Sequence, residues 1–228
     1  MQLAGKKVEI REYLNGIYSS ILLKDIVARL KISDVLLLER IINFVFDNIG
    51  NILSIRKIAN TITSGGRKVD AKTVEKYLQG LMDSLMIYQV KRYNIKGKQY
   101  LMTKEKYYLA DLGLRYFVLG DKGVDQSHIL ENIVYLELIR RGYQVFVGTI
   151  PNGEIDFVAM RQGEIEYYQV SPTVMDVETL KRELSPLQKI TDQFPKYLLT
   201  LDVLGAGTSH EGIRQLNVLE WLLSRDRM

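Results

Sequence analysis

The chain has 228 residues, and 46% of them are hydrophobic, which is enough for one large packed domain or two small ones. It has no cysteine and two histidines, which excludes disulfides, thiolate metal sites, cysteine nucleophiles and histidine-rich metal sites. No stretch approaches the roughly 18 apolar residues needed to span a bilayer, and Met1 to Arg11 is polar, so we expect a cytoplasmic protein with no membrane partner.

Positive charge is concentrated in one segment. The whole chain has a net charge of +4, but residues 54–106 contain twelve lysines and arginines against four acidic residues, a local net charge of +8. A surface of this sign favours a polyanionic partner such as DNA, because each bound phosphate releases condensed counterions. The segment is therefore a candidate for nucleic-acid binding.

The basic segment lies in a region with a recognisable order of elements. Apolar periodicity and capping residues predict three helices, over residues 34–48, 54–63 and 71–86. Two β-prone runs around a polar, glycine-containing turn predict a hairpin over residues 87–103. Three helices followed by a hairpin predict a winged helix-turn-helix.

In a winged helix the third helix enters the major groove and the hairpin lies on the phosphate backbone. The residues placed for these contacts are Arg67, Lys68, Lys72, Thr73 and Lys76 around the start of the third helix, and Arg92, Lys96 and Lys98 on the hairpin. We expect DNA binding that is steeply salt-dependent and mostly sequence-neutral. A solvated face on a protein-docking or dimerisation module is the alternative, and it stays open.

Tyrosines accompany the basic hairpin. Tyr93, Tyr100, Tyr107 and Tyr108 have rings that could stack on bases, but hairpin strands use tyrosine routinely for cross-strand packing. We favour packing for these four side chains.

The remainder of the chain alternates strands and helices. Helices are expected over residues 127–141, 176–187 and 218–223, and strands over 107–111, 144–148, 154–160, 165–171, 197–201 and 213–217. This pattern predicts an α/β domain with a mixed central sheet flanked by helices. The whole chain is then α+β, with a helical domain before the sheet domain.

Carboxylates in the second region form a candidate site. Glu131 lies in a predicted helix, and period-two alternation places Glu154 and Asp156 on one face of a strand. Gln169 and Ser171 share a face of the next strand. In phosphodiester-cleaving sites such acids bind Mg²⁺, and a nearby lysine stabilises charge or orients water. The alternative is that these acids are relics of a lost site, or that Arg140, Arg182 and other cations hold them in ion pairs.

Seven motifs in fixed order carry a family resemblance, namely YLNGIYSSILLKDIV, FDNIGN, RYNIKGK, YYLADLGLR, ILENIVYLELIRRGY, EIDFVA and YYQVS. In these motifs the chain resembles, nearly end to end, prokaryotic AAA-type ATPases with a C-terminal domain of unknown function. The resemblance implies a remnant of an ATPase lid or connecting segment over residues 1–33, a winged helix over 34–106 and a PD-(D/E)XK restriction-endonuclease-like domain over 107–228. The chain has no glycine-rich loop followed by Lys-Ser or Lys-Thr, so we expect no ATP binding by that route.

The resemblance also implies roles for the candidate site. Glu131 would be the helix acid and Asp156 the strand acid, with Gln169 as a third ligand of Mg²⁺. Where the family pattern has Glu-x-Lys, this chain has Gln169-Val170-Ser171, so a negative charge and an ammonium group are missing. Lys181 or Arg182, on the following helix, would then take the place of the lysine.

Three functions follow from these observations. The first is a nucleic-acid-associated, non-ATPase module of an AAA-type ATPase with an inactive nuclease-like domain. The second is a Mg²⁺-dependent DNA endonuclease that uses the candidate site. The third is a protein-docking module that couples an ATPase assembly to a partner. His128, at the start of the Glu131 helix, is expected to cap or pack rather than to bind a metal.

Overall fold

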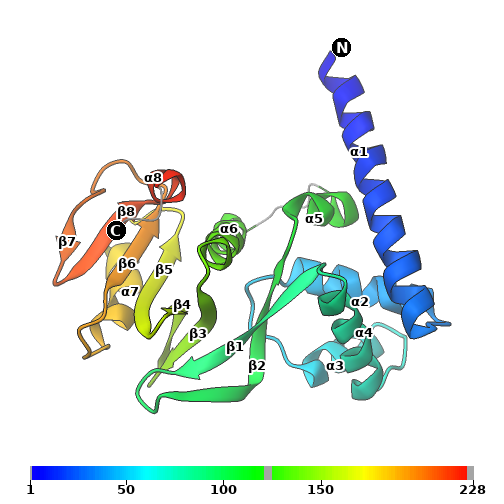
Figure 1. Ribbon diagram of the computed structural model, residues 1–228, viewed down its shortest axis with the longest axis horizontal. Coiled ribbons are helices and arrows are strands. Elements are labelled where there is room, and N and C mark those ends of the chain that lie inside the picture. Colours follow the sequence, from blue (N-terminus) through cyan, green and yellow to red (C-terminus); the bar gives the residue numbers. More distant parts are fainter. Residues whose placement is uncertain (1, 121–124, 225–228) are drawn as a thin grey trace. The chain divides into compact units, whose positions relative to one another are not determined.

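The structure is a computed structural model that describes residues 2–120 and 125–224, without the side chains of residues 2–7, 102 and 103. The chain divides into two compact units (Figure 1). The first contains residues 2–89 and 107–120, and the second contains residues 90–106 and 125–224. This division differs from the expected boundary between residues 106 and 107, because part of the hairpin belongs with the sheet unit.

The first unit is mainly helical. Its helices in the described residues are α1 (Gln2–Ser20), η1 (Ile21–Ala28, π-helical), α2 (Val35–Asp47), α3 (Ile55–Ser64), α4 (Ala71–Asp83) and α5 (Leu112–Leu119). Helices α2, α3 and α4 confirm the three predicted helices. Each begins after a capping side chain that accepts a backbone N–H, from Asp34, Ser54 and Asp70 respectively. Helices α1, η1 and α5 were not predicted from the sequence.

The core of the first unit is built around α2, whose Leu38, Ile41, Ile42 and Phe46 are fully buried. Burial of each such side chain stabilises the fold by about 1.5–3 kcal/mol. Helix α4 lies close to η1 and the residues after it, because a Cβ on Gly80 would come 3.3 Å from the Ile26 side chain and 2.5 Å from the Leu30 side chain. A larger residue at position 80 would therefore require the Leu30 side chain to move.

The second unit contains the sheet. Its strands are β1 (Ile87–Asn94), β2 (Gln99–Leu109), β3 (Gln144–Ile150), β4 (Gly153–Arg161), β5 (Glu164–Ser171), β6 (Lys196–Thr200), β7 (Ser209–His210) and β8 (Ile213–Asn217), and its helices are α6 (Gln126–Arg140), α7 (Val177–Gln188) and α8 (Val218–Leu223). The strand order is β2-β1-β3-β4-β5-β6-β8-β7. β1 is parallel to β3, β4 is antiparallel to β3 and β5, and β6 is parallel to β5 and β8. The mixed sheet and the α+β class are confirmed.

One expected strand boundary was wrong. Residues 99–103 and 107–111 were expected as separate strands, whereas β2 runs without interruption from Gln99 to Leu109. Its first residues belong to the sheet unit and Tyr107 onwards to the helical unit, so one strand serves both.

Helices α6 and α7 lie beside the sheet (Figure 1). Leu184, Leu187 and Ile190, on α7 and just after it, join one apolar cluster with Ile155 and Val158 of β4. Helix α6 packs on the strands through a separate set of residues. Among them is Tyr135, whose ring centre lies 6.1 Å from that of Phe157.

The register of β3 and β4 shifts between Phe146 and Gly148. Between these positions β4 has one residue more than β3. Such a bulge changes the direction of the side chains on the strand with the extra residue, and Asp156 lies in this part of β4. A Cβ on Gly148 would lie within 3.0 Å of Ile155, Val158 and Ile95, so the strands approach too closely there for a larger residue.

Helices of the length and apolarity required for crossing a membrane do not occur among the described residues.

Candidate functional site

A buried lysine lies at the centre of the carboxylate cluster. Lys106 comes from β2, and its Nζ atom lies 2.8 Å from Glu131 Oε1, 2.8 Å from Glu154 Oε1 and 3.9 Å from Asp156 Oδ1. Its side chain is 5% exposed. The structure therefore joins three predicted acids through a cation that was not among the predicted site residues.

Local structure places these four side chains. Asp125 begins α6 by accepting the Ser127 N–H, and Glu131 follows on the buried face of that helix. Glu154 and Asp156 lie on β4, and Asp156 Oδ2 accepts the Val170 N–H at 2.8 Å. The backbone hydrogen bonds between β4 and β5 begin at Phe157. Just beyond this point the Asp156 side chain, rather than a backbone carbonyl of β4, accepts the Val170 N–H.

Burial and charge control protonation in this cluster. Burial opposes the charge on Lys106, but Glu131, Asp156 and Glu154 together raise its pKa, so it stays an ammonium. Burial, and then repulsion from Glu131, raise the pKa of Asp156, although Lys106 acts against this rise. Asp156 thus retains its proton to a higher pH than an ordinary aspartic acid.

His128 extends the cluster, with Nδ1 lying 3.6 Å from Glu131 Oε2. The Glu131 carboxylate raises the pKa of His128, while partial burial and Lys106 lower it by less. A protonated His128 and a protonated Asp156 would leave two carboxylates facing two cations. This pairing would balance the buried charge.

The raised pKa of His128 predicts a specific pH dependence of stability. The folded state binds this proton more tightly than the unfolded chain, whose histidine pKa is about 6.5. The stabilisation is therefore fully present below about pH 6.5 and is lost as the pH rises through the raised value. In urea unfolding, the free-energy difference between the native protein and His128→Gln should be larger at about pH 5.5 than at about pH 8.5. A difference that does not change with pH would contradict this coupling.

The other predicted catalytic residues lie away from Lys106. Gln169 is buried and donates from Nε2 to Glu183 Oε2 at 2.9 Å, while its Oε1 atom accepts the Asp156 N–H at 3.4 Å. Lys181 is exposed and pairs with Glu178 at 3.1 Å. The structure thus brings together Glu131, Glu154 and Asp156, and connects Gln169 to them only through the backbone of Asp156.

Arg182 likewise does not reach the acids, because its side chain is 71% exposed and its guanidinium pairs with Glu183. Arg140 pairs with Glu137 rather than with the three acids of the cluster. Lys106 is instead the cation that pairs with these acids, so the ion-pair alternative holds through this lysine and not through Arg140 or Arg182.

These residues do not fit a Mg²⁺ ion in the observed arrangement. Lys106 contacts the Glu131 and Glu154 carboxylates at hydrogen-bonding distance, and Asp156 Oδ2 accepts a backbone N–H. Mg²⁺ requires near-octahedral oxygen ligands at about 2.0–2.1 Å. Within residues 2–120 and 125–224, no group of three Asp, Glu or His side chains is arranged to hold a metal ion.

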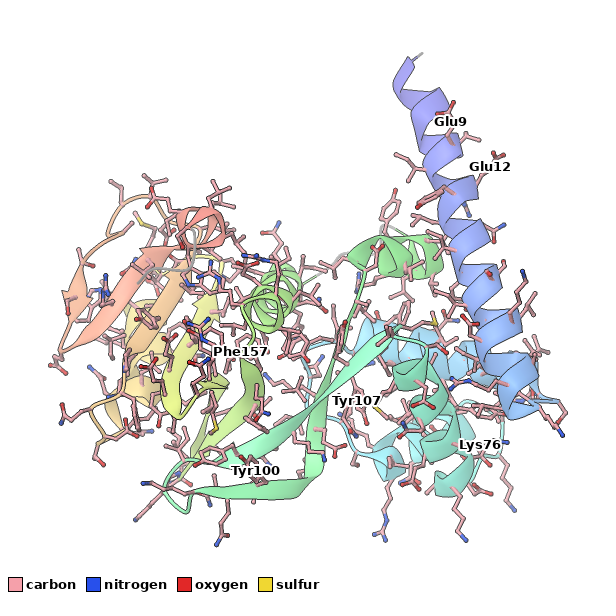
Figure 2. The ribbon with its side chains drawn as sticks, viewed as in Figure 1. Glu9, Glu12, Lys76, Tyr100, Tyr107 and Phe157 are labelled. Carbon is pink, nitrogen blue, oxygen red and sulfur yellow. The ribbon has the colours of Figure 1, made fainter. Side chains whose placement is uncertain are left out.

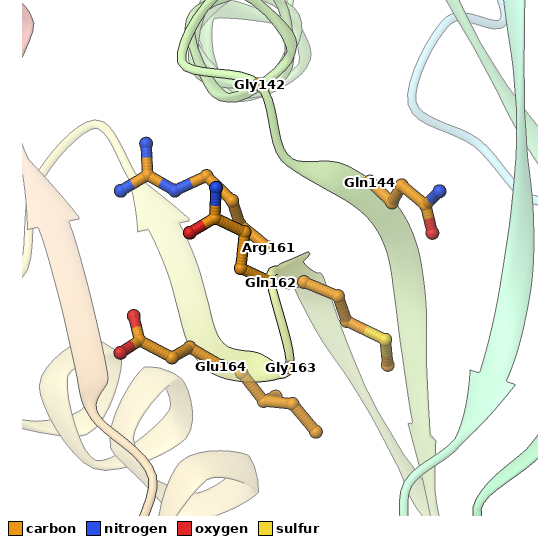
Figure 3. Close-up of a pocket in the computed structure, with 8 residues that line it drawn as sticks. Gly142, Gln144, Arg161, Gln162, Gly163 and Glu164 are labelled. Carbon is orange, nitrogen blue, oxygen red and sulfur yellow. The ribbon is translucent and has the colours of Figure 1, made fainter.

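The carboxylates around Lys106 do not line the hollow described for the surface of this unit. A hollow of about 630 Å³ lies around the β4–β5 turn and is lined by Gly142, Gln144, Met160, Arg161, Gln162, Gly163, Glu164 and Ile165 (Figure 3). The carboxylates have the chemistry of a closed ionic centre rather than of an open cleft.

The predicted nucleic-acid residues of the helical unit divide into two groups. Arg67 forms an ion pair with Asp34, and Lys76 donates to the Leu30 carbonyl at 2.9 Å, so both contribute to the fold (Figure 2 labels Lys76). Lys68 and Lys72 are exposed at the start of α4. Thr73 is half-buried, and its N–H is accepted by the Asp70 cap.

The hairpin cations belong to the sheet unit. Arg92 is half-buried on β1, where it pairs in register with Val147 of β3, while Lys96 and Lys98 are exposed in the turn. The hairpin is therefore not an isolated projection, because β1 is hydrogen-bonded to the sheet beyond Val90.

Lys106 was missed because its neighbours in the sequence are compatible with either a solvated or a buried lysine. It ends a run of basic residues that appeared solvated, but it is followed directly by Tyr107, Tyr108 and Leu109, all of which are buried. The sequence did contain a signal for a buried lysine. Lys106 is followed by three large apolar or aromatic residues, and the predicted acids had no assigned cation to pair with.

Comparison with known proteins gives relatives without an assigned function. The chain is 40% identical over 210 residues to an uncharacterized protein of Haemophilus influenzae, a match that covers 92% of this chain and 52% of that protein. It is 29% identical over 188 residues to an uncharacterized protein of Methanocaldococcus jannaschii, covering 81% and 40% respectively. The chain thus spans about half the length of these curated relatives or less. No solved structure matches it.

A family assignment comes from the first half of the sequence. Residues 2–125 match the family described as "Domain of unknown function (DUF8612)". This match includes the helical unit and the whole β1–β2 hairpin with Lys106. Since it covers more than half of the chain, the protein belongs to the DUF8612 family.

Proposed function

We propose that this chain is a nucleic-acid-binding, non-ATPase module of an AAA-type ATPase. In this proposal α2, α3, α4 and the β1–β2 hairpin form a winged helix that contacts DNA phosphates. The sheet unit is a nuclease-like domain that has lost metal-dependent cleavage.

The observation that carries the binding proposal is the exposed cationic surface at the start of α4. Lys68 and Lys72 are exposed there, and neither has an ion pair among the described residues. Arg56 and Lys57 are exposed on the preceding helix α3. Such cations contact phosphate oxygens without reading bases, which favours sequence-neutral binding.

Support for a non-cleaving sheet unit comes from Lys106. Its ammonium bridges carboxylates that would otherwise be ligands for a divalent cation, and Gln169 is engaged with Glu183. The alternative of an active endonuclease would require these contacts to break. Displacing a buried ammonium from its carboxylates is costly, so we favour the inactive form.

The ATPase association rests on the resemblance of the motifs. The matched relatives are about twice as long as the aligned region, so they contain parts to which this chain does not correspond. We propose that this chain contributes the nucleic-acid contact and that ATP hydrolysis, where it occurs, belongs to another module.

DNA binding can be tested by fluorescence anisotropy with a labelled duplex at several salt concentrations. The double variant Lys68→Glu with Lys72→Glu should weaken binding at least about tenfold at ~0.1 M salt, and should reduce the slope of log K against log salt by about two. The matched control is Lys24→Glu with Lys189→Glu, which changes the net charge equally at exposed positions outside this surface.

The outcomes separate the alternatives. Equal weakening in both double variants would mean that only net charge matters, and absence of duplex binding by the native chain would leave protein docking as the better function. Cleavage is tested separately with supercoiled plasmid and Mg²⁺ or Mn²⁺, where we expect none. Nicking that Asp156→Ala abolishes would overturn the inactive assignment in favour of the endonuclease.

A further inference from the structure

Three aromatic rings from three adjacent strands meet at the β2 edge of the sheet. Tyr100 of β2 lies 5.0 Å from Phe146 of β3 and 5.5 Å from Tyr93 of β1, measured between ring centres. Tyr93 and Phe146 are 6.1 Å apart. The three rings therefore form a continuous group, which we call the aromatic edge, across the β2-β1-β3 order of the strands.

The members of the aromatic edge differ in burial. Tyr93 is buried and belongs to the same apolar cluster as Ile155 and Val158, and Phe146 packs against that cluster. Tyr100 is 56% exposed (Figure 2). The two inner rings hold Tyr100 in place, so much of its ring is presented to solvent at a small cost in conformational entropy.

The hairpin that carries Tyr93 and Tyr100 is rich in cations, while burial raises the pKa of the Tyr93 phenol and Asp192, which lies close to it, raises this pKa further. Residues 90–104 contain five cations and no aspartate or glutamate. Lys91 lies two residues before Tyr93 on β1 and therefore projects from the same face as that ring. Lys91, Lys96, Lys98 and Lys104 are exposed. An exposed ring on a hairpin with several exposed cations favours a partner that combines flat aromatic groups with negative charge.

We propose that the aromatic edge binds single-stranded nucleic acid, with one base stacked on Tyr100 and flanking phosphates held by Lys91, Lys96 and Lys98. Aromatic side chains on neighbouring strands bind unpaired bases in this way, whereas the bases of a duplex are already stacked on each other. This inference rests on the proposed function for the phosphate contacts of the hairpin, and it specifies unpaired bases as the substrate of the sheet unit.

An acidic polypeptide is the competing partner, because it offers negative charge without bases. The exposed ring favours nucleic acid over such a polypeptide, since polyglutamate would gain only from the lysines. Tyr100 therefore distinguishes the two partners.

The experiment compares Tyr100→Ala, Tyr100→Phe and the native chain in anisotropy titrations. The ligands are a labelled oligothymidylate of about 15 nucleotides, an abasic strand of the same length and a duplex. Tyr100→Ala should weaken binding to the oligothymidylate by roughly 5- to 150-fold, which corresponds to the loss of one base stack. Tyr100→Phe should retain binding within about twofold because the ring remains.

Two controls make the result specific. The abasic strand and the duplex should each bind the native chain and Tyr100→Ala with the same affinity. Tyr116→Ala, which replaces an exposed tyrosine of the helical unit, should bind all three ligands as the native chain does. A 2-aminopurine within the strand should be quenched by the native chain and by Tyr100→Phe but not by Tyr100→Ala.

Specific outcomes overturn the inference. Unchanged oligothymidylate binding by Tyr100→Ala, or an equal loss on the abasic strand, would exclude stacking on this ring. Polyglutamate that competes as well as oligothymidylate would assign the surface to acidic proteins. If the native chain binds no nucleic acid at all, the proposed function itself is refuted. This outcome differs from a failure of base stacking alone, in which the native chain still binds nucleic acid.

Discussion

Replacing Lys106 by methionine is expected to lower the free energy of unfolding by about 3–5 kcal/mol. The ammonium bridges Glu131 and Glu154 in a nearly closed environment, so its removal leaves buried carboxylates without their countercharge. Urea denaturation followed by circular dichroism measures this change. Lys91→Met, at an exposed position of the same hairpin, is the matched control and should stay within about 0.5 kcal/mol of the native value.

The loss should depend on pH and on the partner carboxylate. Without the ammonium, the folded carboxyl groups retain protons to higher pH than unfolded ones, so the deficit should be smaller at about pH 5 than at about pH 8. The double variant Lys106→Met with Glu131→Gln should recover part of the stability, because one uncompensated charge is removed. A pH-independent deficit with no recovery in the double variant would show that Lys106 acts through packing of its methylene chain.

Replacing Arg141 by methionine is expected to cost about 2–3 kcal/mol. Its buried guanidinium pairs with Glu137 at 2.7 Å, donates to the Trp221 carbonyl and lies 4.2 Å from the centre of the Trp221 ring. One side chain thus joins the end of α6 to α8. Arg140→Met is the control, because Arg140 also pairs with Glu137 but is 63% exposed, and it should cost less than about 1 kcal/mol.

Tryptophan fluorescence gives a local reading of the same change. Trp221 is the single tryptophan of the chain and is 2% exposed. Its emission should shift to longer wavelength in Arg141→Met before global unfolding, and remain unchanged in Arg140→Met. Identical stabilities and spectra for the two variants would mean that Arg141 does not anchor α8.

Local signals were sufficient for most of the elements. Capping by Asp34, Ser54 and Asp70, with apolar residues at helical spacing, identified α2, α3 and α4. Alternation identified β4 and β5 and predicted that Glu154 and Asp156 share one face of a strand, and both side chains approach Lys106. These features are predictable because each depends on residues that are close in sequence.

The features that were missed depend on distant residues. The alignment of β1 with β3 is set by hydrogen bonds between segments about fifty residues apart, and no local pattern encodes such pairing. The same holds for Gln169, whose amide contacts Glu183 on α7. The expected approach of Lys181 and Arg182 to the acids relied on the family resemblance, whereas nearby glutamates pair with both side chains.

The chain enters each of its two units twice, in the order helical, sheet, helical, sheet, and it crosses between them within β1 and again within β2. Neither unit is therefore encoded by one uninterrupted stretch of gene. A stretch that ends before β1 lacks α5 of the helical unit, and a stretch that begins at α6 lacks Lys106 and the parts of β1 and β2 that complete one edge of the sheet. The two units should consequently be inherited together, and a relative that retains only one of them would need a replacement for the segment it lost.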